Sequence, residues 1–245
     1  MSIQGKKVLV FSAHAADYVW RAGGTICHYI DEGAEVKVIC VSLGIRGESN
    51  DLWKQGLNEE QVRATRRAET EKAAGILGIT NFEIWDLQDY PIVCDKALED
   101  RIVKEIRTFR PDIILTHDRY DVLNPDHDNI SKLVYRCGIM SNSSGVIVEG
   151  TKATKQMQFY GFEPHQTELS DYKPGCFINI TSAYDRKVAA MKCFQAQKHL
   201  IQYYTDRAYM RGNHARRLSG DNSIAYAESF APVFPYVGNE FCLYE

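Results

Sequence analysis

Two residues near the N-terminus have the types and the spacing of metal ligands. An apolar run ends at His14, and Asp17 follows three positions later with two alanines between them. A third candidate, His127, lies far along the chain in the segment NPDHDN. Two imidazole nitrogens and one carboxylate oxygen suit Zn²⁺, and three protein ligands leave a coordination position open for water or substrate. The spacing alone is equally compatible with a helix-capping His14 and an exposed His127, because such patterns often arise by chance.

Alternating strands and helices are expected to bring these ligands together. In parallel sheets covered by helices, ligands bind at the carboxyl ends of the strands, and His14, Asp17 and His127 all follow predicted strands. Segments of helical spacing separate these strands, which predicts an α/β fold with a mostly parallel sheet and helices on both faces. The strands are short apolar runs at residues 7–12, 35–42, 82–87 and 113–117.

The alternation of predicted strands and helices becomes less regular after about Gly150. Two further strands are expected at residues 156–162 and 176–180, then a long helical stretch from about residue 183 to 217 and a tail rich in Pro and aromatic residues. We expect one domain over residues 1–245, in which residues 1–150 form the core with the metal site and residues 151–245 wall the cleft.

The composition argues against several classes of protein. The chain has 29 Lys and Arg against 32 Asp and Glu, so no basic surplus points to nucleic acid. No apolar run approaches the ~18 residues of a membrane span, and the first one is too short for a signal peptide; we therefore expect no membrane partner and a cytoplasmic location. Seven scattered cysteines without a C-x-x-C pair argue against disulfides and a thiolate zinc site. Gly23 and Gly24 lie inside a predicted helix and do not form the G-x-G-x-x-G pattern of a dinucleotide-binding site. We expect them to let that helix pack close to the sheet.

Three segments together resemble the LmbE/PIG-L superfamily of zinc-dependent deacetylases: AHAADYVWRAGGTI, VRATRRAETEKAAGILG and PDIILTHDRYDVLNPDHDN. The resemblance implies a Rossmann-like fold and one Zn²⁺ per subunit, with Fe²⁺ or Mn²⁺ as alternatives, bound by His14, Asp17 and His127. The family's general base, a carboxylate, falls on Ala16. Because a positioned base contributes ~10²- to 10⁴-fold, ordinary amide hydrolysis is not expected.

The first motif is similar to the form found in the 4-oxalomesaconate hydratase branch of that superfamily, which acts in gallate breakdown. This resemblance implies reversible addition of water to the C=C of an unsaturated oxo-tricarboxylic acid, with the metal as a Lewis acid. It also implies a homo-oligomer, with a hexamer as one form. Two other hypotheses for the function stay open: a deacetylase or amidohydrolase with a relocated base, and a metal-binding protein without catalytic activity.

Two residues are candidates for proton transfer in such a hydration. Glu48 follows the second strand, where a carboxylate near the metal can accept a proton from water. His165 follows a predicted strand, and its imidazole can supply a proton to carbon. Either residue can instead be an ordinary solvated loop residue.

Arginines are the expected partners of the substrate carboxylates. Arg46 and Arg119 lie in loops that lead to candidate residues, and Arg217 belongs to a basic stretch that is equally compatible with an anion pocket, a subunit contact or a solvated helix face. Asp126 is expected to orient His127 from outside the coordination sphere, as are its neighbours Asp121 and Asp128.

Overall fold

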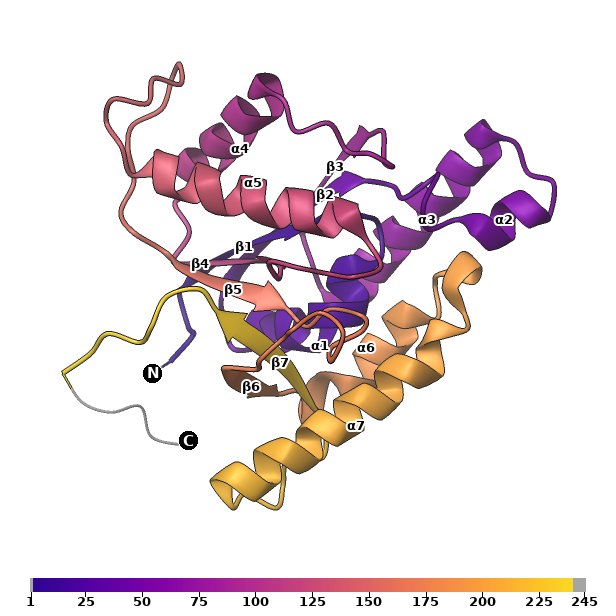
Figure 1. The fold of residues 1–245 in the computed structure, drawn as a ribbon. Helices are drawn as coiled ribbons and strands as arrows, with labels where there is room; N and C mark the ends of the chain where they lie inside the picture. The colour runs from indigo at the N-terminus through magenta and orange to yellow at the C-terminus, as the bar shows by residue number, and fades with distance from the viewer. Residues whose placement is uncertain (1, 240–245) are drawn as a thin grey trace.

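The structure is a computed structural model that describes residues 2–239 (Figure 1). A seven-stranded sheet in the order β3-β2-β1-β4-β5-β7-β6 forms its centre. The first five strands run parallel, and β7 runs antiparallel between β5 and β6. The mostly parallel sheet predicted from the sequence is therefore confirmed. The strands are β1 Lys7–Ser12, β2 Glu35–Ser42, β3 Asn81–Leu87, β4 Ile113–His117, β5 Gln158–Phe162, β6 Cys176–Asn179 and β7 Ala227–Pro232.

Helices cover both faces of the sheet (Figure 1). The helices α4 and α5 pack together on one face, and α1, α3, α6 and α7 share a hydrophobic cluster on the other. A short helix α2 and two 3₁₀ turns complete the regular structure of the described residues. The helices are α1 Asp17–Asp31, α2 Asn50–Lys54, α3 Glu59–Leu77, α4 Lys96–Phe109, α5 Pro125–Ser141, α6 Tyr184–Met191 and α7 Leu200–Ser219, with the turns η1 Thr181–Ala183 and η2 Gln195–Gln197.

The residue pattern of β1 explains this layering. Val8 and Val10 belong to the cluster beneath α1, whereas Leu9 and Phe11 belong to the cluster beneath α4 and α5. Successive side chains of a strand point to opposite faces, so an uninterrupted apolar run requires cover on both sides. Tyr18, in the first turn of α1, is fully buried in the same cluster as Val8 and Val10.

The C-terminal third differs from the prediction in two places. The long helical stretch is divided into α6, η2 and α7, and β7 lies within the segment described as a tail rich in Pro and aromatic residues. The sequence of β7, AESFAP, contains no β-branched residue and ends in Pro, so its pairing depends on β5 and β6 rather than on local propensity. Strands from both parts of the chain share one sheet; residues 1 and 240–245 of the expected domain lie outside the described residues.

Three smaller expectations concern packing, cysteines and membranes. A Cβ on Gly24 would come within 2.6 Å of the Ile180 side chain, so this glycine does permit close packing of α1. The six cysteines among the described residues are unpaired, and Cys242 lies outside them. No helix in residues 2–239 is long and apolar enough to cross a bilayer.

Candidate metal centre

The three predicted ligands come from two turns at the carboxyl edge of the sheet. His14 lies between β1 and α1, Asp17 begins α1, and His127 lies in the first turn of α5, the helix that follows β4 after a loop. Because β1 and β4 are parallel neighbours, the two turns meet. Hydrogen bonds fix the first turn: the Ser12 hydroxyl donates to the His14 carbonyl at 2.6 Å, and the His14 N–H donates to Asp17 Oδ2 at 2.8 Å.

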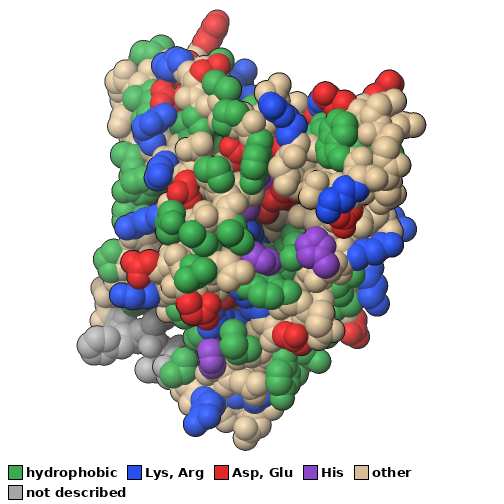
Figure 2. Space-filling model, turned by 45° about the vertical axis from the view of Figure 1, so that its right-hand side comes forward, with side chains coloured by type: hydrophobic (Ala, Val, Ile, Leu, Met, Phe, Trp, Pro, Cys, Tyr) green, Lys and Arg blue, Asp and Glu red, His purple; other side chains and the backbone are tan. Residues whose placement is uncertain are grey.

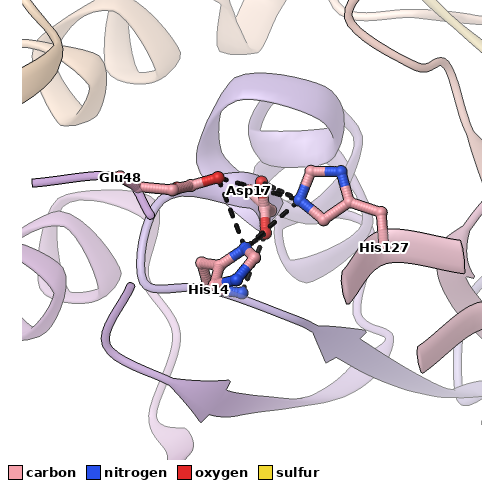
Figure 3. A group of neighbouring side chains, drawn as sticks. All are labelled: His14, Asp17, Glu48 and His127. Atoms are coloured by element: carbon pink, nitrogen blue, oxygen red, sulfur yellow. Dashed lines mark hydrogen bonds and ion pairs between the residues drawn. The ribbon is translucent and has the colours of Figure 1, made fainter. Parts of the chain in front are cut away.

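A fourth side chain, Glu48, reaches the same point from the loop after β2 (Figure 3). One ligand atom from each of the four residues lies within 4.8 Å of the others. His14 Nδ1 is 3.3 Å from Asp17 Oδ2 and 3.3 Å from Glu48 Oε1. His127 Nε2 is 3.3 Å from Asp17 Oδ1 and 3.7 Å from Glu48 Oε1. The structure thus brings the predicted base into the same group as the predicted ligands.

This donor set fits a divalent cation. Two imidazole nitrogens and two carboxylates suit Zn²⁺, Fe²⁺ or Mn²⁺, and His14, Asp17 and His127 are almost completely buried. Burial tends to lower the pKa of His127, but the Asp17 and Asp121 carboxylates together raise that pKa to about 9. Burial tends to raise the pKa of Glu48, as does Asp17, yet the two imidazoles hold it well below its usual value. A bound cation would replace the protons that these imidazoles otherwise carry beside two carboxylates.

Outer carboxylates hold both imidazoles, and the expected partner of one of them is corrected. Asp121 Oδ2 lies 2.9 Å from His127 Nδ1. Asp126 was expected to orient His127, but its carboxylate lies 3.4 Å from Nε2 of the other imidazole, His14. The reason is that Asp126 also accepts the N–H of Tyr90 in the loop after β3, which draws it toward that side of the site. Both imidazoles therefore have a carboxylate beside the nitrogen that faces away from the ligand group.

Arg21 connects this outer layer to the C-terminal part of the chain. Its guanidinium donates to Asp121 Oδ2 at 3.1 Å and to the Glu163 carbonyl at 3.0 Å, and it lies 3.7 Å from Asp17. The third acidic neighbour, Asp128, accepts the N–H of Asp121 and so acts on His127 only indirectly. The buried guanidinium of Arg21 offsets part of the negative charge of the carboxylates at the site.

His117, the last residue of β4, lies at the site although its residue pattern did not predict it. Its ring stacks on His127 with centroids 4.0 Å apart, and its Nε2 accepts the Ala13 N–H at 3.0 Å. Burial and the charge of His127 lower its pKa well below the usual value, so His117 is a neutral acceptor outside the ligand group. Its position at the end of a predicted strand was the signal that could have identified it.

Glu48 is held by three side chains that were not predicted to act at the site. The Asn124 amide donates to Oε1 at 3.2 Å, and the Gln197 amide donates to Oε2 at 3.3 Å. The guanidinium of Arg66, which is fully buried, lies 3.9 Å from Oε2. Because each of these three groups comes from a different segment, together they hold the Glu48 carboxylate in an orientation that faces the predicted ligands.

The other proton-transfer candidate, His165, lies in the loop after β5 and outside the ligand group. Its ring stacks on Tyr203 with centroids 4.4 Å apart, and the Arg207 guanidinium donates to its carbonyl at 2.5 Å. Burial, together with the charges of Arg21 and Arg207, lowers the pKa of His165 to about 4. His165 is thus neutral near pH 7 in the free chain.

The three arginines expected to bind substrate are all exposed. Arg46 lies in the loop that carries Glu48, Arg119 lies in the loop after β4, and Arg217 lies in the last turn of α7. The helix α7 reaches the surroundings of His165 through a different residue, Arg207. Figure 2 shows a hollow in one face of the molecule where histidine, acidic and basic side chains gather.

Comparisons with known proteins place this site in a family. The model of the PIG-L family, described as GlcNAc-PI de-N-acetylase, matches residues 9–137, more than half of the chain. The chain belongs to the PIG-L family. The match begins within β1 and ends within α5, so it includes all four members of the ligand group.

Among PIG-L proteins, the chain is similar to hydratases as well as deacetylases. A 4-oxalmesaconate hydratase of Pseudomonas putida is 40% identical over 97% of this chain and 93% of that protein. The structure of GalB, the 4-carboxy-2-hydroxymuconate hydratase of Pseudomonas putida, matches with a TM-score of 0.91 and 39% identity over 97% of this chain and 100% of that one. The N,N'-diacetylchitobiose deacetylase of Pyrococcus horikoshii matches with a TM-score of 0.74 and 22% identity over 93% and 84% of the two chains, and this likeness shows the fold alone.

The turn between His14 and Asp17, two of the predicted ligands, contains only methyl side chains. Ala15 and Ala16 are fully buried, and the Ala15 carbonyl accepts the Thr70 hydroxyl at 2.6 Å. Ala16 immediately precedes α1. The second carboxylate of the group therefore comes from another loop, at Glu48.

Proposed function

We propose that this chain is a metal-dependent hydro-lyase that adds water reversibly to the C=C of an unsaturated oxo-tricarboxylate, 4-oxalomesaconate or its enol tautomer, in gallate degradation. The observation that carries the proposal is the pairing of a complete ligand group with a methyl side chain at Ala16, in a chain similar to a hydratase over 97% of its length. The ligand group suits an ion that acts on substrate oxygen, whereas Ala16 offers no base.

His14, Asp17 and His127 would hold the metal, and we propose Zn²⁺. The bound ion would supply Lewis acidity that stabilises negative charge on the oxo group conjugated to the alkene. Asp121 and Asp126 would keep the two imidazoles oriented, because each lies against a nitrogen that faces away from the group.

Glu48 is the proposed base. As water attacks the alkene carbon remote from the oxo group, a C–O bond forms and the Glu48 carboxylate accepts a proton from that water. The lowered pKa keeps this carboxylate ionised. Amides of Asn124 and Gln197 hold its two oxygens, which limits the geometries that it can adopt.

His165 is the proposed acid, which supplies the proton that forms the new C–H bond on the carbon next to the oxo group. In the free chain its pKa of about 4 leaves it neutral near pH 7, because burial and the cations Arg21 and Arg207 disfavour a further positive charge. A substrate with three carboxylates would offset those cations, so binding would favour protonation of His165. His165 would take up its proton from solvent, and the proton that Glu48 accepts from water would return to solvent, so the reaction balances.

The remaining partners are also proposals. Arg46, Arg119 and Arg217 are the proposed holders of substrate carboxylates, and exposed guanidinium groups are free to form paired hydrogen bonds with them. The exposure of Arg217 at the end of α7 also suits a contact with a neighbouring subunit in the proposed homo-oligomer. We expect that assembly to form in the cytoplasm.

Turnover of 4-oxalomesaconate by the zinc-loaded protein tests the proposal. Loss of the conjugated absorbance at a rate that depends on bound metal is the expected result. No change with fully metallated protein would contradict it. Release of acetate from N-acetylglucosaminides would instead support the deacetylase alternative, in which Glu48 serves as a relocated hydrolytic base. Reconstitution of the metal-free protein with Zn²⁺, Fe²⁺ or Mn²⁺ in parallel then identifies the ion that supports turnover.

A further inference from the structure

A tyrosine in the loop after β3 has an unusual backbone conformation next to the metal centre. Tyr90 has a φ of 52°, in the left-handed region that residues with a Cβ seldom adopt. Its side chain is 38% exposed, so burial in the core does not account for this conformation. Strained backbone of this kind persists only where surrounding contacts fix it, and it is concentrated at binding and catalytic sites.

The contacts that fix Tyr90 come from the metal centre itself. The Asp126 carboxylate accepts the N–H of Tyr90 and the N–H of Ile92, both at 2.9 Å. The same carboxylate lies 3.4 Å from His14 Nε2. The side chain that supports one predicted metal ligand thereby also holds the backbone at Tyr90 and at Ile92.

A second carboxylate joins this loop to the loop that carries Glu48. Asp89, buried and adjacent to Tyr90, accepts the N–H of Arg46 at 3.0 Å and that of Gly47 at 2.7 Å. Because Gly47 directly precedes Glu48, the two loops are fixed to one another at the position of the proposed base. The conformation of Tyr90 is therefore tied to both sides of the ligand group.

The Tyr90 ring lies over these loops. A Cβ on Gly47 would come within 2.3 Å of the ring, so the phenol rests directly on the glycine backbone. The ring centroid is 6.4 Å from that of the His14 imidazole. Among residues 2–239, no group forms a hydrogen bond with the Tyr90 hydroxyl, although a phenol can donate one and accept others.

We propose that Tyr90 is a substrate-binding residue: its ring forms one wall of the entrance to the metal centre, and its hydroxyl donates a hydrogen bond to a substrate carboxylate. This inference rests on the proposed function for the identity of the substrate. The partly exposed ring beside Gly47 and His14, its unpaired hydroxyl and its fixed backbone together favour a role in contacting ligand. Asp89 and Asp126 act as positioning residues, since they hold the backbone of the two loops.

The test compares Tyr90→Phe with Tyr135→Phe, a tyrosine on α5 that is 41% exposed and packs against Phe159. Turnover of 4-oxalomesaconate gives KM and kcat, calorimetric titration with tricarballylate gives the affinity for a polycarboxylate that has no alkene, and metal analysis gives zinc content. We expect Tyr90→Phe to raise KM and to weaken tricarballylate binding by about tenfold or more, because a hydrogen bond to a charged group is lost. The zinc content and kcat should change little, and Tyr135→Phe should match the wild type.

A second pair of variants tests the position of the ring. Gly47→Ala should displace the phenol and weaken tricarballylate binding in the wild-type background, but it should have little further effect when combined with Tyr90→Ala. Equal effects of Gly47→Ala in both backgrounds would overturn the proposed wall.

Failure of this inference and failure of the proposed function give different results. If the wild type turns over 4-oxalomesaconate while Tyr90→Phe keeps the wild-type KM and tricarballylate affinity, the role of Tyr90 is overturned and the hydratase proposal stands. If the wild type shows no turnover but Tyr90→Phe still weakens tricarballylate binding, the hydratase proposal fails and Tyr90 remains a carboxylate-binding residue.

Discussion

The two parts of the chain contribute to the site in different ways. The four residues of the ligand group lie in the first part, within residues 9–137, on turns that follow parallel neighbouring strands. The second part, from β5 to β7, supplies His165, Arg207 and Gln197, which surround that group rather than join it. We infer that the first part binds the metal and the second part shapes the cleft for a substrate. Under this proposal the PIG-L fold keeps its metal site, and the residues around that site change the reaction.

The largest effect should come from removing a ligand in the first part. We expect His127→Ala to lose both bound metal and measurable turnover, a loss beyond the roughly 10- to 100-fold cost of altering a residue outside the coordination sphere. Metal analysis after desalting, together with the hydratase assay, measures both. A variant that kept stoichiometric metal would show that His127 is not a ligand.

The next effect separates the base from the ligands within the same group. Glu48→Gln should keep its metal and lose about 10²- to 10⁴-fold in kcat, because the amide cannot accept the proton of water. Glu59→Gln, at the exposed start of α3, is the control. Loss of metal from Glu48→Gln would assign Glu48 to the coordination sphere instead, and full activity would exclude it as the base.

The attachment of the second part to the first should depend on a buried ion pair. Lys187 donates to the Trp20 carbonyl and to Glu228, and Glu228 also accepts the N–H groups of Gly24 and Thr25 in the middle of α1. Lys187→Met should lower the free energy of unfolding by about 3–5 kcal/mol, since it leaves a buried carboxylate without its cation.

Chemical denaturation of the metal-loaded protein measures the effect of Lys187→Met. Lys192→Met, at the exposed end of the same helix, serves as the matched control. If both variants lost the same small amount of stability, the ion pair would not hold the two parts together.

A smaller effect is expected from the outer partner of His127. Asp121→Asn should weaken metal affinity by about 10- to 100-fold while the fold stays intact. Turnover should recover when excess zinc is supplied, because the ligands themselves are unchanged. Competition with a chromophoric chelator gives the affinity. An unchanged affinity would remove Asp121 from the account of the metal centre.

The smallest expected effect is a change in the pH dependence of hydration. It depends on His165, in the second part of the chain. An acid must be protonated to act, so a His165 pKa of about 4 predicts that kcat/KM for hydration falls as the pH rises above that value. The fall in kcat should begin at a higher pH, because bound carboxylates offset Arg21 and Arg207. His165→Gln should remove this limb from both profiles, and a limb that persists in the variant would assign the acid to another group.

Some parts of the fold and of the site could be predicted from the sequence, because they depend on local or periodic patterns of residues. The apolar runs of β1 and β2 and the helical spacing of α1 led to a parallel sheet, which the structure confirms. The burial of Arg66 could not be predicted from such a pattern, since an arginine on a helix is usually exposed. Its guanidinium is buried because the Leu43 carbonyl and the Gln197 side chain, from two distant segments, both accept its hydrogen bonds.

Local patterns in the chain are enough to predict the mostly parallel sheet and the order of the turns that carry the candidate ligands, because periodicity and strand ends are properties of short segments. Contacts between distant segments place Glu48 in the ligand group, Asp126 beside His14, His117 on the ring of His127 and Tyr90 over the neighbouring loops. These contacts depend on strand order and on the conformations of loops far apart in the chain. A sequence pattern places residues at an edge of the sheet, but hydrogen bonds between loops determine which side chains meet there.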